Sequence, residues 1–125
     1  MNWKFLSVLA FIGGFIGLFA GCSKQSEDKL GVAPCDTTNV RYSVQIVSIL
    51  QNNCYACHGA SSNSGSGGIV LEGYTFLKVY ADNGYLLGNV SHAPGYIGMP
   101  YGLPKLPDCE INTIAAWVHH GSPNN

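Results

Sequence analysis

The sequence has little charge of either sign. Lys and Arg together number 6 and Asp and Glu number 7 among 125 residues, so the net charge is −1 with the histidines neutral. A surface that binds nucleic acid carries a basic stripe or patch, and this composition does not supply one. The sequence also lacks sustained alternation of apolar and polar residues, the pattern of a half-buried strand. We therefore expect no nucleic acid partner and a mainly α-helical fold.

The first part of the chain has the composition of a targeting segment. Lys4 supplies a positive start, residues 5–19 are almost entirely apolar, and small residues stand directly before Cys22. This arrangement resembles a bacterial lipoprotein signal, in which residues 1–21 are removed and Cys22 carries the lipid. The alternative is an uncleaved membrane helix, for which the run is short against the roughly 20 apolar residues that a bilayer needs. Both interpretations place the remainder outside the cytoplasm, on the periplasmic side or at the cell surface, attached to a bacterial membrane.

The segment after Cys22 differs in composition from the rest. Residues 22–34 are polar and charged and show no apolar period, which is typical of a flexible tether. We expect one small folded domain in residues 35–125. A domain of this size buries only a modest core, and a large apolar cofactor would add much of the missing buried area.

The sequence concentrates its reactive side chains in the run Cys-Tyr-Ala-Cys-His, where Cys54, Cys57 and His58 are the candidates. Two thiols separated by two residues, with a histidine directly after the second, form the attachment motif of c-type haem. This spacing lets both sulfurs bond the vinyl groups on one edge of a porphyrin, while the next side chain lies under the iron. We therefore predict one covalent haem c, with Cys54 and Cys57 as its thioether positions and His58 as the proximal iron ligand.

Two other interpretations of the paired cysteines are weaker. A zinc site needs a second pair of ligands at comparable spacing, whereas His119 and His120 are adjacent. These two histidines lie at a predicted helix C-terminus, where cationic groups are favoured, and we expect them to be exposed. A thioredoxin-like dithiol lies at the end of a strand in a βαβ pattern, and no such pattern precedes Cys54.

Methionine is scarce, and beyond the initiator the sequence has only Met99. It stands between Gly98 and Pro100, which favour extended backbone outside a helix. It is therefore less expected as core filling than a methionine on an apolar helix face. A thioether ligand favours ferrous iron and raises the potential of a His-ligated haem. We predict Met99 as the distal iron ligand, with His92 as its competitor and an open or water-bound position as the third option.

The sequence contains five cysteines. Lipid at Cys22 and haem at Cys54 and Cys57 leave Cys35 and Cys109. In an oxidising compartment two remaining cysteines most simply pair. This disulfide would close a loop of about seventy residues and contribute on the order of 4 kcal/mol to stability. The alternative is two separate buried thiols.

Apolar residues at helical spacing predict four helices. Ser43 is the expected N-cap of the first, Pro107 and Asp108 offer a cap for the last, and Gly121 is the stop signal after it. The predicted helices span residues 43–53, 74–80, 84 or 85 to 90, and 108–120, with a loop of small residues at 59–68. Inward-facing positions are expected at Ile46 and Leu50 in the first helix, Phe76, Leu77 and Tyr80 in the second, and Trp117 in the last.

Taken together, these features resemble the small class I cytochrome c family, in the style of lipid-anchored monohaem domains of Bacteroidetes-type bacteria. The resemblance covers roughly residues 35–123. It rests on the motif at 54–58 after a helix, on Gly-Met-Pro around Met99, and on a terminal helix containing Ile-Ala-Ala-Trp-Val-His-His-Gly. It implies a compact helical fold in which the first and last helices cross and the haem has one exposed edge. The spacing from His58 to Met99 is shorter than in the longer members of the family.

The resemblance also implies a function, which is one-electron transfer between redox partner proteins at a membrane surface, without catalysis. The alternative is a haem enzyme or gas sensor with an open sixth position, such as a small peroxidase. For that function His92 is the one acid–base candidate close to Met99 in the sequence. The third interpretation is a thiol-disulfide protein without haem, which would carry a reducible pair at Cys54 and Cys57.

Overall fold

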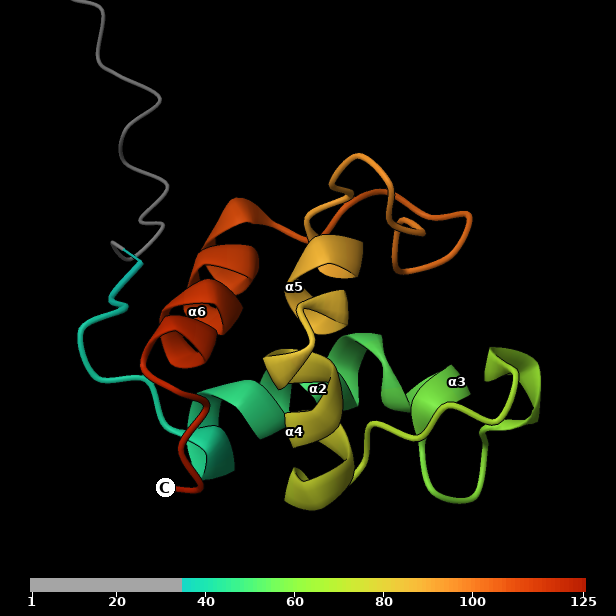
Figure 1. The fold of residues 1–125 in the computed structure, drawn as a ribbon, viewed down its shortest axis with the longest axis horizontal. Helices are drawn as coiled ribbons and strands as arrows, with labels where there is room; N and C mark the ends of the chain where they lie inside the picture. Colours follow the sequence, from blue (N-terminus) through green and yellow to red (C-terminus); the bar gives the residue numbers. More distant parts are fainter. Residues whose placement is uncertain (1–34) are drawn as a thin grey trace, which may run out of the picture. The chain divides into compact units, whose positions relative to one another are not determined.

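The computed structural model describes residues 35–125 (Figure 1). The predicted signal peptide at 1–21, the lipid position at Cys22 and the tether at 22–34 lie outside the described residues. Within the described part the chain forms five α-helices and no strand, which confirms the mainly α-helical fold. The helices are α2 (Val47–Asn53), α3 (Tyr55–His58), α4 (Tyr74–Asp82), α5 (Tyr85–Val90) and α6 (Asp108–His119), with a π-helical segment at Tyr42–Ile46 and a 3-10 turn at Ser64–Ser66.

The first helix begins differently from its prediction. Ser43 forms no side-chain cap and lies inside the π-helical segment that leads into α2. The N–H groups of Tyr42 and Ser43 instead donate to Asn125, at 2.7 Å to its side-chain oxygen and 2.9 Å to its main-chain oxygen. The Arg41 N–H donates to Gln45 Oε1 at 2.9 Å. The N-cap predicted at Ser43 is therefore wrong, because Asn125 supplies the acceptors that a cap would supply.

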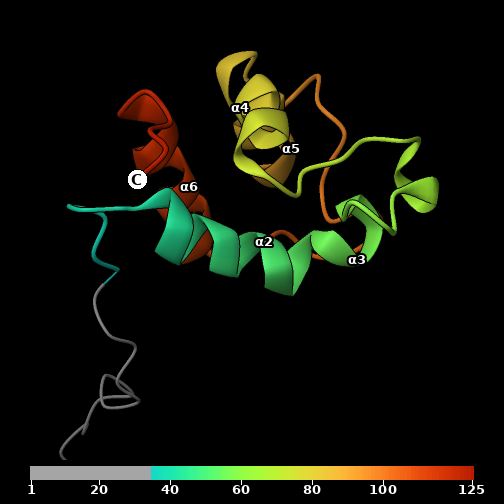
Figure 2. The same ribbon diagram turned by 90° about the horizontal axis from the view of Figure 1, so that it is seen from below.

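The core lies where α2 meets α4, α5 and α6 (Figure 2). The side chains of Ile46, Leu50, Leu77, Ile114 and Trp117 have no exposed surface. Ile46 and Leu50 are one helical turn apart, so both reach the same face. Burying a large apolar side chain of this kind stabilises the fold by about 1.5–3 kcal/mol. The predicted core positions Ile46, Leu50, Leu77 and Trp117 are confirmed.

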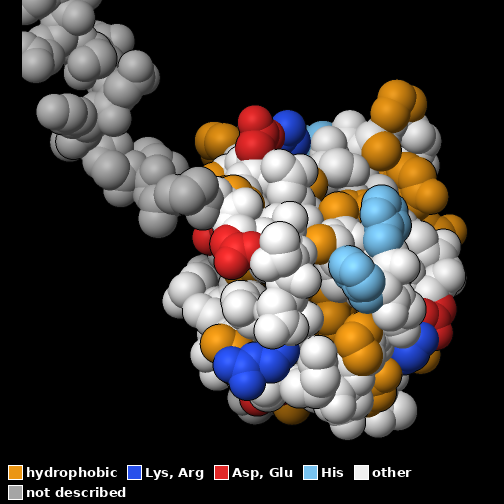
Figure 3. Space-filling view, turned by 90° about the vertical axis from the view of Figure 1, so that its left-hand side faces the viewer, with side chains coloured by type: hydrophobic (Ala, Val, Ile, Leu, Met, Phe, Trp, Pro, Cys, Tyr) orange, Lys and Arg blue, Asp and Glu red, His pale blue; other side chains and the backbone are white. Residues whose placement is uncertain are grey.

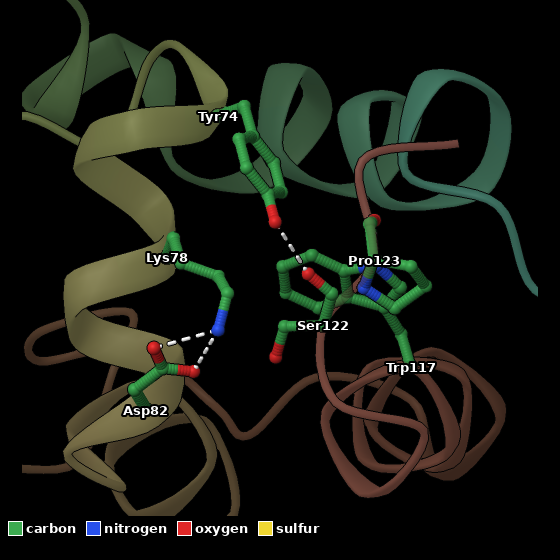
Figure 4. A network of polar contacts seen from close by, with 6 residues as sticks. All are labelled: Tyr74, Lys78, Asp82, Trp117, Ser122 and Pro123. Atoms are coloured by element: carbon green, nitrogen blue, oxygen red, sulfur yellow. Dashed lines mark hydrogen bonds and ion pairs between the residues drawn. The ribbon is translucent and has the colours of Figure 1, made fainter.

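Trp117 joins the last helix to the first. Its ring stacks on Tyr42 with the ring centroids 6.0 Å apart and an interplanar angle of 29°. Its Nε1–H donates to the carbonyl of Pro123 at 2.9 Å, and the Tyr74 hydroxyl of α4 donates to the carbonyl of Ser122 at 2.9 Å (Figure 4). The segment after α6 is thereby held by side chains from α4 and α6, and the first helix contacts the last.

The helix α4 departs from its prediction at one position. Leu77 and Ala81 are buried, whereas Phe76 is 57 % exposed. Residues four apart share one face of a helix, so Leu77 and Ala81 together define the inward face and Phe76 lies beside it. The inward placement of Phe76 is therefore wrong. Lys78 and Asp82 form an ion pair along the same helix (Figure 4).

The helix α6 has the boundaries that its sequence signals predict. It begins at Asp108 directly after Pro107 and ends before Gly121, whose φ of 84° is the left-handed conformation that glycine adopts most readily. With 12 residues it is the longest helix described. No helix within residues 35–125 is both long enough and apolar enough to span a bilayer.

Cys35 and Cys109 form a disulfide, with their Cα atoms 5.4 Å apart. The predicted pairing is confirmed. The bond joins the first described residue to the first turn of α6. It therefore fixes the start of the domain to its last helix.

Candidate functional site

The candidate haem motif lies where α2 gives way to α3. Cys54 has φ −124° and ψ −39°, outside the helical region, and this break separates the two helices. The backbone N–H groups of Cys57 and His58 both donate to the Cys54 carbonyl, at 3.1 Å and 2.8 Å. All three predicted site residues therefore belong to a single turn, as their spacing requires. Cys54 and Cys57 are both free thiols in the structure.

The two thiols have different surroundings. Cys57 is exposed, whereas Cys54 is partly buried where the end of α2 meets the start of α6. Burial, and next the nearby carboxylate of Glu110, raise the pKa of the Cys54 thiol to about 11. Glu110 is held there because Asn53 Nδ2 donates to its Oε2 at 3.1 Å. No sequence pattern indicates that Glu110 lies near Cys54.

His58 is fixed at two points by a segment that comes later in the chain. Its Nδ1 lies 3.0 Å from the carbonyl oxygen of Ile69, and the Leu71 N–H donates to the His58 carbonyl at 2.8 Å. A carbonyl oxygen only accepts, so Nδ1 must carry the proton of the neutral ring. The lone pair of the His58 ring is therefore on Nε2, the tautomer of a histidine that binds a metal through that nitrogen. No sequence signal identifies Ile69, because its main-chain oxygen makes the contact.

The loop of small residues after the motif folds back onto α3. Gly59 is buried, and a Cβ atom there would lie 2.7 Å from the Tyr55 carbonyl and 2.8 Å from Ser62 Oγ. Ser62 Oγ donates to the Tyr55 carbonyl at 2.7 Å, and the Ala60 N–H donates to Glu72 Oε2 at 2.7 Å. Only glycine fits this close approach, and the loop supports the segment that contacts His58.

Met99 lies in a separate loop that is tied to α5. Its N–H donates to the carbonyl of Asn89, in the last turn of α5, at 3.0 Å. Its own carbonyl lies 3.0 Å from Nε2 of His92 and accepts the proton of that nitrogen. The Met99 side chain is half-buried. Both polar atoms of the Met99 backbone are thus held by residues at the end of α5.

Two aromatic rings lie against glycines in the same region. The ring of Tyr96 covers Gly88 of α5 so closely that a Cβ atom on Gly88 would lie 2.4 Å from it. The ring of His92 lies against Gly98, where a Cβ atom would be 3.1 Å away. Tyr96 also packs edge-on against Tyr85, with ring centroids 5.8 Å apart. These contacts give the loop a defined path over α5.

His92, the predicted competitor for the iron, has its ring nitrogen engaged elsewhere. Its Nε2 donates a hydrogen bond to the Met99 carbonyl, and its ring packs against Gly98. In this arrangement His92 braces the loop that carries Met99. Sequence spacing placed His92 before Met99 without indicating this contact.

The motif turn and the Met99 loop lie at the same end of the domain. Figures 1 and 2 both show α3 and the loop that follows α5 on the side away from α6. Several large apolar side chains near these two segments are exposed: Ile69, Ile97, Tyr101 and Leu103. Exposed apolar surface of this kind suits contact with a large apolar ligand. The donor set also suits haem, since it comprises two free thiols, an imidazole with a free Nε2 and a thioether.

The two histidines at the end of α6 are exposed, as their position predicts. His120 Nδ1 donates to the carbonyl of Ala116 at 2.6 Å, which secures the last turn of the helix. Histidine side chains are visible among apolar ones on the face of the domain where α6 lies (Figure 3). In residues 35–125 no three His, Cys, Asp or Glu side chains gather as metal ligands would.

Comparison of the chain with protein-family models, with curated proteins and with solved structures finds no match.

Proposed function

We propose that this protein is a membrane-anchored electron carrier with one covalent haem c and a fold like that of the class I cytochromes c. Cys54 and Cys57 would hold the haem through thioether bonds, and His58 and Met99 would be the iron ligands. Bound haem supplies reversible one-electron transfer between ferric and ferrous iron. The partners are proteins that donate and accept electrons outside the cytoplasm, and a lipid on Cys22 is the membrane attachment.

The orientation of His58 is the observation that supports this proposal most strongly. A haem motif that occurred by chance in the sequence would place no constraint on the imidazole. Here the ring is held by the Ile69 carbonyl at 3.0 Å, which leaves Nε2 as the free nitrogen. Hydrogen bonding of the other ring nitrogen to a carbonyl is the usual way in which proteins orient a metal-binding histidine.

The other residues have separate tasks in this function. The turn at Cys54 brings both sulfurs and the imidazole to one place on the chain. The loop that carries Met99 is held at the end of α5 by two hydrogen bonds. The Met99 N–H donates to Asn89, and the Met99 carbonyl accepts from His92. Exposed apolar side chains such as Ile97 and Leu103 would cover porphyrin surface and exclude water from it.

The function is tested by producing the protein in a host that attaches haem and recording its mass and absorption spectrum. The expected mass is that of the chain with one haem bound covalently. The ferric protein should show the weak band of sulfur-to-iron ligation at about 695 nm. Colourless protein from such a host would overturn the proposal.

The distal ligand is tested by Met99→Ala. This substitution removes the thioether, so the band at about 695 nm should disappear and the ferrous protein should bind carbon monoxide readily. Val79→Ala is the control, because Val79 is an exposed apolar residue of α4, outside the Met99 loop, and the band should persist there. Ready carbon monoxide binding by the unsubstituted protein would instead favour a haem enzyme or sensor with an open sixth position.

A further inference from the structure

We propose that His92 is a positioning residue that holds Met99 in place for the iron. This inference rests on the proposed function and adds to it a residue that controls how firmly the sixth position is occupied. The contact that carries it is the hydrogen bond from His92 Nε2 to the Met99 carbonyl, 3.0 Å long. In this arrangement the Nε2 of His92 faces the main chain of Met99 and is not available to the iron.

With this hydrogen bond, both the N–H and the carbonyl of Met99 are bound by residues at the end of α5. Asn89 accepts from the Met99 N–H at 3.0 Å, and His92 donates to the Met99 carbonyl. Asn89 lies in the last turn of α5, and His92 follows two residues after the end of that helix. Removing the donor from His92 therefore frees one side of Met99 from α5 while the other side stays attached.

The backbone conformation of His92 is set by the end of α5. Its φ is 53°, the left-handed region that residues other than glycine adopt uncommonly. His92 and Ser122 are the two non-glycine residues in the described part of the chain with a positive φ. A conformation of this kind persists where surrounding contacts determine it. At His92 these contacts are the hydrogen bonds that end α5, from the His92 N–H to the Asn89 carbonyl at 3.2 Å and from the Ala93 N–H to the Gly88 carbonyl at 3.0 Å. The helix end thus fixes the point from which the His92 ring reaches the Met99 carbonyl.

Gly98 makes the approach of the ring possible. A Cβ atom at this position would lie 3.1 Å from three atoms of the His92 ring, closer than ordinary contact allows. The glycine directly before Met99 therefore leaves room for the ring that holds Met99. His92 and Gly98 act together, and neither contact depends on the chemistry of the iron.

The expected consequence is a change in competition for the sixth position. When Met99 leaves the iron more often, carbon monoxide finds an open position more often, and its apparent affinity rises in proportion. A neutral hydrogen bond is worth about a fivefold change in an equilibrium constant. Loss of the His92 donor should therefore raise the apparent affinity of the ferrous protein for carbon monoxide about fivefold.

The experiment compares His92→Gln with His92→Leu in the haem-containing full chain. Both side chains are unbranched at Cβ and meet the same backbone strain at φ 53°. Gln carries an amide N–H the same number of bonds from Cα as the histidine Nε2, so it can restore the donor, whereas Leu has none. The readouts are the apparent carbon monoxide affinity and the intensity of the band at about 695 nm.

A matched control comes from the other end of the domain. His120 also donates from its ring to a backbone carbonyl, that of Ala116 at 2.6 Å, and is exposed. His120→Leu should leave both readouts unchanged. His92→Gly provides a second variant without the donor, because glycine accepts the left-handed backbone freely. It should behave as His92→Leu does.

The proposal is supported if His92→Leu and His92→Gly raise the affinity about fivefold and weaken the band, while His92→Gln stays within about twofold of the unsubstituted protein. It is overturned if both donor-free variants keep the original affinity, or if Gln behaves like Leu. A purely structural role would change thermal stability without raising the carbon monoxide affinity of the two donor-free variants, and this outcome also overturns the proposal. Protein isolated without haem would overturn the proposed function itself, an outcome that is visible before any variant is compared.

Discussion

At the scale of single residues, the fit between Gly88 and Tyr96 decides whether the Met99 loop can lie on α5. The Tyr96 ring occupies the space that any larger side chain at residue 88 would need. Gly88 has no left-handed backbone that would require glycine. The reason for glycine at this position is therefore space alone.

Gly88→Ala should destabilise the protein by about 1–3 kcal/mol, the usual cost of forcing atoms into a packed site. The added Cβ would lie 2.4 Å from the Tyr96 ring, so the ring and its loop must move. Thermal or denaturant unfolding measures the effect. Gly65→Ala is the matched control, because nothing lies within 4 Å of its Cβ position, and it should leave stability nearly unchanged.

Tyr55, between the two cysteines of the motif, should make stability depend on alkaline pH. Burial, and next the nearby Tyr42, raise the pKa of Tyr55 from 10.0 to about 12. Between these two values the unfolded chain releases the proton while the folded chain retains it. Folded-state stability should therefore fall as the pH rises from about 10 to about 12.

Tyr55→Phe removes this group and should make the alkaline loss of stability shallower. Denaturant unfolding at pH values below and above 10 compares the two proteins. Tyr101→Phe is the control, because Tyr101 is 80 % exposed. If Tyr55→Phe and the unsubstituted protein lose stability in parallel, the burial of the Tyr55 hydroxyl does not govern the alkaline transition.

At the scale of elements, the first helix obtains its cap from the other end of the sequence. Asn125 accepts from the N–H groups of Tyr42 and Ser43 through two different oxygens. Its side chain therefore acts as a helix cap although it lies far from Tyr42 in the sequence, and its main-chain oxygen adds a second acceptor.

Asn125→Ala should cost about 1 kcal/mol, the typical worth of an N-cap side chain. The substitution removes the acceptor for the Tyr42 N–H and keeps the main-chain oxygen that serves Ser43. Denaturant unfolding measures the change. Asn124→Ala, at an exposed neighbouring position, should have no effect. Equal stability of both variants would show that the first helix does not need this cap.

The helices could be predicted from the sequence wherever local signals determine them. Apolar spacing and Gly121 give the extent of α6 closely, and similar patterns locate α4 and α5. The start of the first helix could not be found, because its partner is Asn125. The prediction that Phe76 faces inward is wrong, because apolar character alone does not show whether a side chain points into the core or lies beside the buried face of the helix.

In the candidate site, too, the features that depend on local sequence could be predicted and those that depend on tertiary contacts could not. The spacing of Cys54, Cys57 and His58 predicts that they share a turn, since the chemistry is local. The contact of His58 with the Ile69 carbonyl is tertiary. It could not be predicted from the sequence, because a main-chain atom makes it and any residue type could supply that atom. The role of His92 depends on a close approach to a glycine, which appears only when the loop is folded.

At the scale of the whole molecule, the disulfide between Cys35 and Cys109 joins the two ends of the described fold. The bond spans a sequence separation of 74 residues. A loop of this length should contribute about 4 kcal/mol, chiefly by restricting the unfolded chain.

The double variant Cys35→Ser, Cys109→Ser should lower the free energy of unfolding by about 4 kcal/mol. Denaturant unfolding measures the change. A reductant should destabilise the unsubstituted protein and leave the double variant unaffected. Equal stability with and without the bond would contradict this prediction and show that the bond does not limit the unfolded chain.

The position of the same bond has a mechanical consequence. A pull applied at residue 35 and opposed at the end of α6 passes through the two sulfur atoms and along that helix. Residues 36–108, which contain α2 to α5 and the candidate haem site, lie in a side loop that carries none of the tension. A domain pulled through residue 35 would thus stretch its last helix first, while Cys54, Cys57, His58 and Met99 keep their spacing.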